Sequence, residues 1–378
     1  MTIKIDSDNN SVCKLLDIAI ESKVSDVHFT TNARETISIR IKGDITKLTD
    51  LKISDVDLVD FFREYDNSST EGVMALVSEG MKPVDTAFTY KGRRFRANVS
   101  HSRKGVSTVL RMLGDTILPL EKLGMPPSVL RVSNFNEGMV LIVGATGSGK
   151  STTLASIIDD INERQPVHII TVEHPIEYVY EDKKALISQK EVGKDCISFE
   201  NAVVAAMRQD PDILLIGEMR DYETIGNALT MAETGHLVFG TLHSNSVIEA
   251  ISRMVDVFPD ESKNMARTQI ASVLRAVVSQ QLIKSSITKD YVALCEVLMM
   301  TDVFRNMIKE NRAIAQIREN LRNPDNKIRG SVHIVDNAYD HIVNKRLAFE
   351  DILGRITGPD LKILADMLRV EIPEEYKS

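Results

Sequence analysis

An eight-residue stretch rich in glycine has the composition and spacing to hold a phosphate group: Gly144-Ala145-Thr146-Gly147-Ser148-Gly149-Lys150-Ser151. It fits the pattern of a glycine, four residues and then Gly-Lys-Ser. Glycines let backbone N–H groups approach a phosphate closely, and a helix N-terminus adds positive potential. In this pattern Lys150 reaches the β and γ phosphates and Ser151 ligates Mg²⁺. The alternative is an ordinary glycine-rich turn, but the full match predicts binding of a nucleoside triphosphate.

Carboxylates follow two apolar runs elsewhere in the chain. Ile213–Ile216 is followed by Gly217 and Glu218, and Val167–Val172 is followed by Glu173. Two strands that each deliver a carboxylate to the same sheet edge favour a nucleotide site over two unrelated surface acids. We expect Glu218 to organise Mg²⁺ and water, with Glu173 as the competing candidate for water activation.

Two histidines flank the run at 237–241. His243 follows it, at the expected C-terminal end of a strand, and is a candidate sensor of the γ-phosphate. His236 precedes the run at 237–241. A structural role, as a hydrogen-bonding residue, and a functional role are equally expected for it.

The elements that would position these residues are short apolar strands separated by helices. The strands are predicted at 139–143, 167–172, 213–216 and 237–241. Nearly continuous apolar runs that alternate with helices indicate a parallel sheet covered on both faces. A core-packed helix is predicted over 267–282, and a charge-rich helical region follows from 301.

The first hundred residues show a different pattern. Helices are predicted over 11–23 and 54–65, the second with Ser54 as N-cap. Half-buried strands alternate at 25–29, 37–41, 84–99 and 107–113, with a hairpin turn at Lys91-Gly92. This is an α+β module of antiparallel type. The predicted organisation is an N-terminal domain at 1–113, a proline-rich linker at 114–127, an ATPase domain at 128–300 and a helical region at 301–378.

Composition narrows the class of protein. The chain has 378 residues, 43% of them hydrophobic and 26% charged, with a net charge of −8. An acidic balance argues against nucleic acid as a partner. The 3 cysteines are far apart, which indicates a reducing cytosol rather than a disulfide scaffold. No apolar run is long enough to span a bilayer, so we expect membrane contact only peripherally, through partners.

Four ordered motifs carry a family resemblance over roughly residues 10–320. They are Gly144–Thr153, which includes Thr152, Glu173–Glu177, Arg208–Asp221 and Thr234–Asn245. With them the chain resembles the ATPases of type II/IV secretion systems, and within these the PilT-type motors that retract type IV pili. Leu274–Gln280 is similar to the helix that follows in these enzymes.

The resemblance implies a fold, an assembly and further site residues. It implies a PAS-like N-terminal domain, a RecA-like P-loop ATPase domain and a homohexamer that works on an inner-membrane platform protein from the cytoplasmic side. Arginines of the N-terminal domain complete the site in that family, and the matching residues here are Arg96, in Arg94–Asn98, and Arg111. The implied function is ATP hydrolysis that drives pilus retraction by pilin depolymerisation, and hence twitching motility.

Two departures keep other functions open. His174 stands where the family's aspartate box usually has Asp, and Val303–Asn306 only half matches the Ala-Ile-Arg-Asn of retraction motors. One alternative is a traffic ATPase of a related type II or type IVB secretion or pilus-assembly system. Assembly is less expected, because polymerising relatives carry an extra N-terminal domain and a four-cysteine motif. The other alternative is a weakly active nucleotide-binding adaptor.

Overall fold

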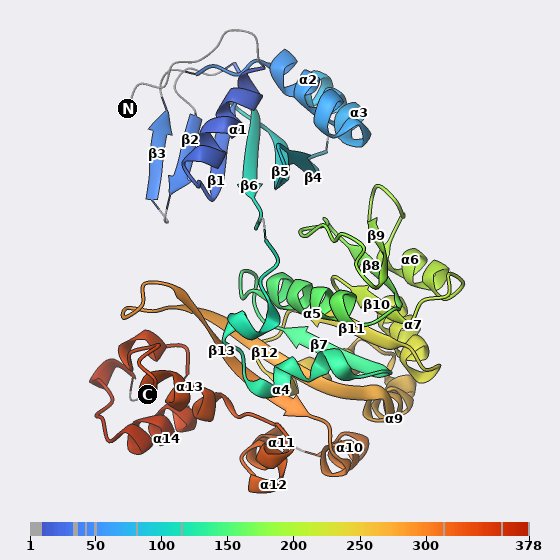
Figure 1. The fold of residues 1–378 in the computed structure, drawn as a ribbon, viewed down its shortest axis with the longest axis vertical. Helices are drawn as coiled ribbons and strands as arrows, with labels where there is room; N and C mark the ends of the chain where they lie inside the picture. Colours follow the sequence, from blue (N-terminus) through green and yellow to red (C-terminus); the bar gives the residue numbers. More distant parts are fainter. Residues whose placement is uncertain are drawn as a thin grey trace. The chain divides into compact units, whose positions relative to one another are not determined.

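The computed structural model describes residues 10–32, 37–41, 44–48, 51–80, 82–114, 116–312, 314–356 and 358–376. The chain divides into two compact units (Figure 1). The first comprises Met1–Thr116 with Pro175–Val179, and the second comprises Ile117–His174 with Tyr180–Ser378. Over the described ranges, none of the helices has the length and apolar character needed to cross a membrane.

The first unit is an antiparallel sheet covered by helices. Its six strands run in the order β3-β2-β1-β6-β5-β4, and each neighbouring pair is antiparallel. The core lies between this sheet and the helices, and its largest buried side chains are phenylalanines such as Phe61, Phe88 and Phe95. The elements are α1 (Ser11–Glu21), β1 (Asp26–Thr30), β2 (Ile37–Ile41), β3 (Asp44–Leu48), α2 (Asp55–Tyr65), α3 (Asn67–Glu79), β4 (Val84–Tyr90), β5 (Arg93–Ser102) and β6 (Gly105–Met112).

Local sequence signals account for two boundaries in this unit. The Ser54 hydroxyl accepts the N–H of Asp57, whose carboxylate accepts the N–H of Ser54 at 2.9 Å, so a capping box starts α2 as expected. Lys91 and Gly92 both have positive φ, 47° and 74°, and form the predicted hairpin turn between β4 and β5.

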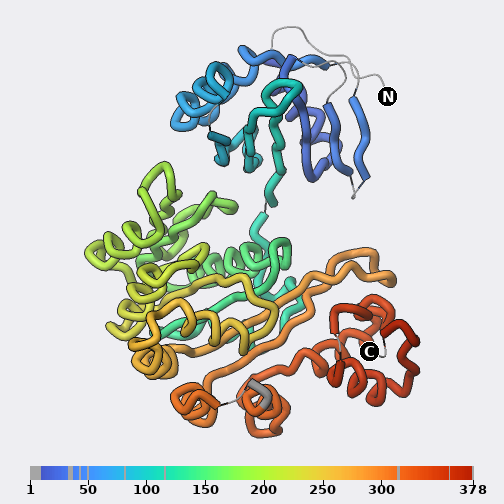
Figure 2. The backbone as a smooth tube through the Cα atoms, turned by 180° about the vertical axis from the view of Figure 1, so that it is seen from behind, coloured from blue at the N-terminus to red at the C-terminus, as the bar shows by residue number. Residues whose placement is uncertain are grey.

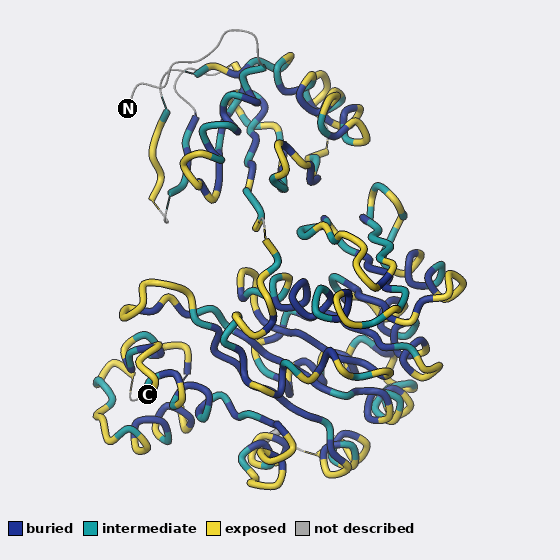
Figure 3. Tube along the Cα trace, viewed as in Figure 1, coloured by how far each residue is buried: buried dark blue, intermediate teal, exposed yellow. Residues whose placement is uncertain are grey.

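The second unit is built on a seven-stranded sheet in the order β13-β12-β7-β11-β10-β8-β9. All neighbouring strands are parallel except β12 and β13, which are antiparallel. Alternate residues of the central strands enter two different cores, with α6 to α9 on one face and α4 and α5 on the other. Figure 3 shows these strands as the most continuously buried part of the unit. The strands are β7 (Gly138–Val143), β8 (His168–Glu173), β9 (Leu186–Glu191), β10 (Ile213–Ile216), β11 (Leu237–Leu242), β12 (Leu274–Lys284) and β13 (Tyr291–Met299).

The helices of this unit follow the sheet along the chain. Two short 3-10 helices, Leu120–Leu123 and Val132–Asn134, flank the short α4, and Leu120 and Met125 are buried in the core beside α5. The α-helices are α4 (Pro127–Leu130), α5 (Lys150–Arg164), α6 (Phe199–Ala206), α7 (Tyr222–Glu233), α8 (Val247–Asp256), α9 (Lys263–Val273), α10 (Asp302–Lys309), α11 (Ile314–Leu321), α12 (Pro324–Ile328), α13 (Ile334–Val343) and α14 (Gly358–Leu368). The predicted fold class, an antiparallel α+β unit followed by a parallel-rich α/β unit with a helical C-terminal region, is confirmed.

The helix predicted over 267–282 is wrong in its second half. Helix α9 ends at Val273, and Leu274 begins β12, which lies between β7 and β13. Val277 and Val278 enter different cores on opposite faces of the sheet. Because both faces are apolar, this segment lacks the alternation that distinguishes a half-buried strand from a helix.

The C-terminal helices pack on the far end of the β12–β13 hairpin. Ile283 of β12 and Leu294 of β13 share a core with Val335 of α13 and Leu361 of α14. The two opposite views agree, since α13 and α14 lie beside this hairpin in Figure 1 and in Figure 2. The hairpin therefore connects the sheet of the second unit with its C-terminal helices.

Candidate nucleotide site

The glycine-rich stretch forms the turn between β7 and α5. Gly144 has φ 154°, and a Cβ there would collide with the carbonyl oxygen of Gln280 and the hydroxyl of Ser148. Gly149 has φ 88° and is the N-cap residue of α5, which begins at Lys150. The glycines are thus required by the backbone and by close packing. The turn leads directly into the N-terminus of α5, which begins at Lys150 and whose dipole favours an anion.

Two observations indicate that the loop is suited to bind a phosphate. The Lys150 ammonium donates hydrogen bonds to the carbonyl oxygens of Gly144 and Ala145 at 2.8 and 3.0 Å, within its own loop. The buried hydroxyl of Ser148 has no hydrogen-bond partner among the described residues. A phosphate in the turn would offer charged oxygens to both groups. Thr146 is exposed, Thr152 is half-buried, and the exposed Ser151 lies in the first turn of α5.

The strand order brings the predicted acidic and histidine residues to the same sheet edge as this loop. Neighbouring strands β7, β11, β10 and β8 are parallel, so the residues that follow them emerge together. Backbone hydrogen bonds join the segments beyond the strands: Gly217 donates to Val172 at 2.8 Å, and Met219 donates to Thr241 at 3.0 Å.

Glu218 lies at the centre of this edge. Its carboxylate accepts a hydrogen bond from Arg220 and lies 3.2 Å from Nε2 of His243. Burial and the positive charge of Lys150 lower the pKa of His243, although Glu218 acts in the opposite direction. The influence of Lys150 indicates that His243 and the phosphate loop share one electrostatic environment. The lowered pKa favours the neutral form of His243, which can donate one hydrogen bond.

Glu173 is the last residue of β8 and lies beside this edge. Its carboxylate accepts hydrogen bonds from Thr171 at 2.8 Å and from Gln189 at 3.3 Å. A Cβ on Gly217 would lie 3.3 Å from the Cα of Glu173, so the two acidic segments are in backbone contact. His174, one residue further along, is exposed.

The remaining candidates have other partners. His236 contacts the carbonyl oxygen of Met231 at 3.0 Å, at the end of α7, which favours a structural role. Arg96 pairs with Asp85 at 2.6 Å, and Arg111 pairs with Asp26 at 2.7 Å, all within the first unit. Burial alone would raise the pKa of Asp26, but hydrogen bonds from Arg111 and Ser25 hold it below its usual value. The Arg111 side chain remains 62% exposed, and its part in the nucleotide site stays a prediction.

Sequence reasoning missed two residues at this edge. Thr241 donates from its hydroxyl to the carbonyl oxygen of Gly217, and Gln280 of β12 contacts the phosphate loop. Thr241 ends a predicted strand and could have been included on that ground. Gln280 carried no usable signal, because its segment was predicted to be helical.

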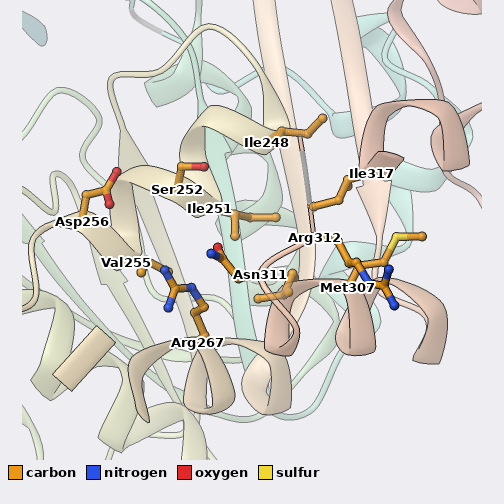
Figure 4. A pocket seen from close by; sticks show the side chains of 11 residues that line it. Ile248, Ile251, Ser252, Val255, Asp256, Arg267, Met307, Asn311, Arg312 and Ile317 are labelled. Atoms are coloured by element: carbon orange, nitrogen blue, oxygen red, sulfur yellow. The ribbon is translucent and has the colours of Figure 1, made fainter. Parts of the chain in front are cut away.

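A pocket of about 310 Å³ lies elsewhere in the second unit, between α8, α9, α10 and α11 (Figure 4). Its lining combines apolar side chains with polar and charged ones, among them Asp256, Arg267 and Arg312. None of the candidate nucleotide-site residues lines it. The chemistry of the glycine-rich loop, and not this cavity, therefore locates the candidate site.

A strand, a phosphate-binding turn and a helix, with carboxylates following neighbouring parallel strands, define a P-loop nucleotide-binding protein. Comparison with known proteins places the chain within that class. The family model for Type II/IV secretion system protein matches residues 7–342. The chain belongs to this family.

The relatives refine the placement. The chain is 48% identical over 229 residues to a "Twitching motility protein" of Neisseria gonorrhoeae, a match that covers 61% of each chain. It is 41% identical to "Type IV pilus retractation ATPase PilT" of Pseudomonas aeruginosa, over 81% of this chain and 87% of that protein. The solved structure of the pilus retraction motor PilT with bound ADP is similar with a TM-score of 0.80 and 37% identity, over 92% of this chain and 97% of that one. The expected resemblance to PilT-type ATPases is confirmed.

Proposed function

We propose that this chain is a motor ATPase that hydrolyses ATP to drive retraction of a type IV pilus. The observation that carries the proposal is the meeting of the phosphate loop, Glu218 and His243 at one sheet edge, in a chain whose relatives include a pilus retraction ATPase. An ADP-bound structure among the similar proteins supports nucleotide binding.

The site residues divide the chemistry among them. The loop amides and Lys150 hold the β and γ phosphates, and Gly144 to Thr152 form the binding surface. Ser151 and Glu218 supply the oxygen ligands that Mg²⁺ prefers, and Mg²⁺ when bound neutralises charge on the phosphate oxygens. Glu218 orients the attacking water, with Glu173 beside it. Neutral His243 has one N–H, which faces Glu218 without nucleotide and is offered to the γ-phosphate when nucleotide is bound.

The proposal extends to an assembly. A homohexamer places Arg96 and Arg111 of the PAS-like domain (1–113) where they offset charge on the transferred phosphoryl group. The linker (114–127) joins that domain to the RecA-like domain (128–300), and the helical region (301–378) follows. The motor acts at the cytoplasmic face of the inner membrane, on a platform protein of the pilus machine.

Two measurements test this function in sequence. The first is ATP hydrolysis by the purified chain, which Lys150→Ala should abolish, because the loop loses its cation on the β and γ phosphates. Lys184→Ala removes an exposed lysine of the same unit and should leave the rate unchanged. Hydrolysis that persists in Lys150→Ala contradicts the site.

The second measurement separates retraction from related traffic functions. In cells that lack the gene, the wild-type chain should restore surface twitching and Lys150→Ala should not. Restored protein secretion without twitching would instead assign the chain to a secretion system. An intact chain that binds ATP without turnover would indicate an adaptor.

A further inference from the structure

Strand β12 runs alongside the strand that leads into the phosphate loop. It pairs in parallel with β7, and Ser279 lies opposite Val143, the last residue of β7. Gln280 therefore lies beside Gly144, where the loop begins. Its side chain is 1% exposed. A buried primary amide needs hydrogen-bond partners for both its donor and its acceptor.

Both partners of the Gln280 amide belong to the phosphate-loop segment. Nε2 donates to the carbonyl oxygen of Ser148 at 2.7 Å, and Oε1 accepts from the hydroxyl of Thr153 at 2.9 Å. A carbonyl can only accept, so Nε2 must face Ser148, and this fixes the orientation of the amide. Ser148 lies within the loop, and Thr153 lies in the first turn of α5. One side chain thus joins the two parts of the phosphate cradle.

The surroundings leave this amide little freedom. A Cβ on Gly149 would lie 3.1 Å from Nε2 of Gln280, so the amide packs directly against the last glycine of the loop. One residue earlier on β12, the Ser279 hydroxyl donates to the carbonyl oxygen of Asn245, in the loop that follows β11. That loop also contains His243. Strand β12 therefore contacts both loops that flank the candidate site.

We infer that Gln280 is a positioning residue that holds the phosphate loop in its anion-receiving conformation. By holding the Ser148 carbonyl against β12, it keeps that oxygen away from the bound phosphates, which it would repel. It also ties the loop to the helix end that supplies Lys150 and Ser151. The inference rests on the proposed ATPase function and adds to it a residue outside the glycine-rich loop.

The test replaces Gln280 by a side chain of similar volume without hydrogen bonds. Gln280→Met removes both contacts, while Gln281→Met is the matched control on the same strand. Gln281 is half-buried, and its side chain makes no hydrogen bond within the ranges that the structure describes. ADP affinity by calorimetry, steady-state KM and kcat for ATP, and amide hydrogen exchange of residues 144–151 are measured for each.

The expected result is a selective loss of phosphate binding. Two hydrogen bonds of ordinary strength correspond to a loss of about tenfold in ADP affinity and a rise of about tenfold in KM for ATP. At saturating ATP, kcat should fall much less, because the groups that perform the reaction remain. Exchange of the loop amides should be faster in nucleotide-free Gln280→Met than in wild type, and Gln281→Met should match wild type in all three measurements.

A second variant covers the case in which Gln280→Met fails to fold. Thr153→Val removes only the hydroxyl that donates a hydrogen bond to Oε1 of Gln280. It should weaken ADP binding by about threefold. In a folded Gln280→Met background it should add no further loss, since the partner is already absent. The inference is overturned if folded Gln280→Met keeps the wild-type ADP affinity and the wild-type exchange of the loop amides. If Gln280→Met does not fold, an unchanged ADP affinity in Thr153→Val overturns it. Failure of the ATPase proposal itself is distinct, because wild type would then show no hydrolysis that depends on Lys150.

Discussion

At the scale of single residues, we expect turnover to depend most directly on Glu218. Its carboxylate is held by Arg220 and His243, so it is already oriented without nucleotide. Glu218→Gln keeps the shape and removes the charge that organises Mg²⁺ and water. ATP binding should persist, while kcat falls by about 100-fold or more. Single-turnover hydrolysis and nucleotide binding measure the two effects. Turnover at the wild-type rate would transfer the role to Glu173.

His174 is the residue at which the motif departs from its relatives' usual aspartate. It is exposed, and it follows Glu173 directly. Because an exposed side chain has few contacts to lose, His174→Asp should be at least as active as wild type, with any difference confined to the pH profile of kcat. A large loss of activity in this variant would show that His174 has acquired a role of its own.

At the scale of elements, a charge cluster around the buried carboxylate of Asp360 links the C-terminal helices. Asp360 of α14 pairs with Arg318 at 2.6 Å and with Arg322 at 2.5 Å. His333, which is 1% exposed, lies 3.9 Å from the same carboxylate and caps α13 by accepting the N–H of Val335. Burial first, and then the charge of Arg322, lowers the pKa of His333 to about 4.

This lowered pKa makes stability depend on pH. As pH falls below about 6.5, the unfolded chain takes up a proton at His333 before the folded chain does, so the free energy of unfolding decreases toward pH 4. His333→Asn keeps a side chain that caps helices well and removes the titration. Between pH 7 and pH 5 the variant should lose about 2 kcal/mol less stability than wild type. Urea unfolding followed by circular dichroism measures this, and equal losses would exclude His333 as the cause.

At the scale of the whole molecule, Arg111 can complete the nucleotide site of its own chain or that of a neighbouring chain in the assembly. Arg111 lies on β6, which ends at Met112, and the second unit begins at Ile117. We expect so short a connection to favour action of Arg111 on the site of its own chain over that of a neighbour. Arg111→Ala should therefore reduce kcat by about 10³-fold, with a much smaller effect on ATP affinity.

Mixing two inactive variants distinguishes the arrangements. If Arg111 acts within its own chain, mixtures of Arg111→Ala and Lys150→Ala should remain inactive, and this is the result we expect. Recovery of part of the ATPase activity on mixing would show that Arg111 completes the site of a neighbouring chain. Co-purification of the two variants with different tags is the control that mixed assemblies form.

The sequence by itself determined the features that neighbouring residues encode. Glycine spacing and the preceding apolar run predicted the phosphate loop, and the ends of two further runs singled out Glu218 and Glu173 as candidates. The Ser54 cap and the Lys91-Gly92 turn followed from local chemistry in the same way. Each of these features depends on contacts within a few residues of the chain.

Only the tertiary structure decided what depends on distant partners. The segment 274–282 is a strand because β7 and β13 provide its hydrogen bonds on either side, and β7 is remote in sequence. An apolar run buried on both faces has no period from which this could be read. Gln280 gains its place beside the phosphate loop from the same pairing. The loop was therefore evident from the sequence, whereas the strand that supports it was not.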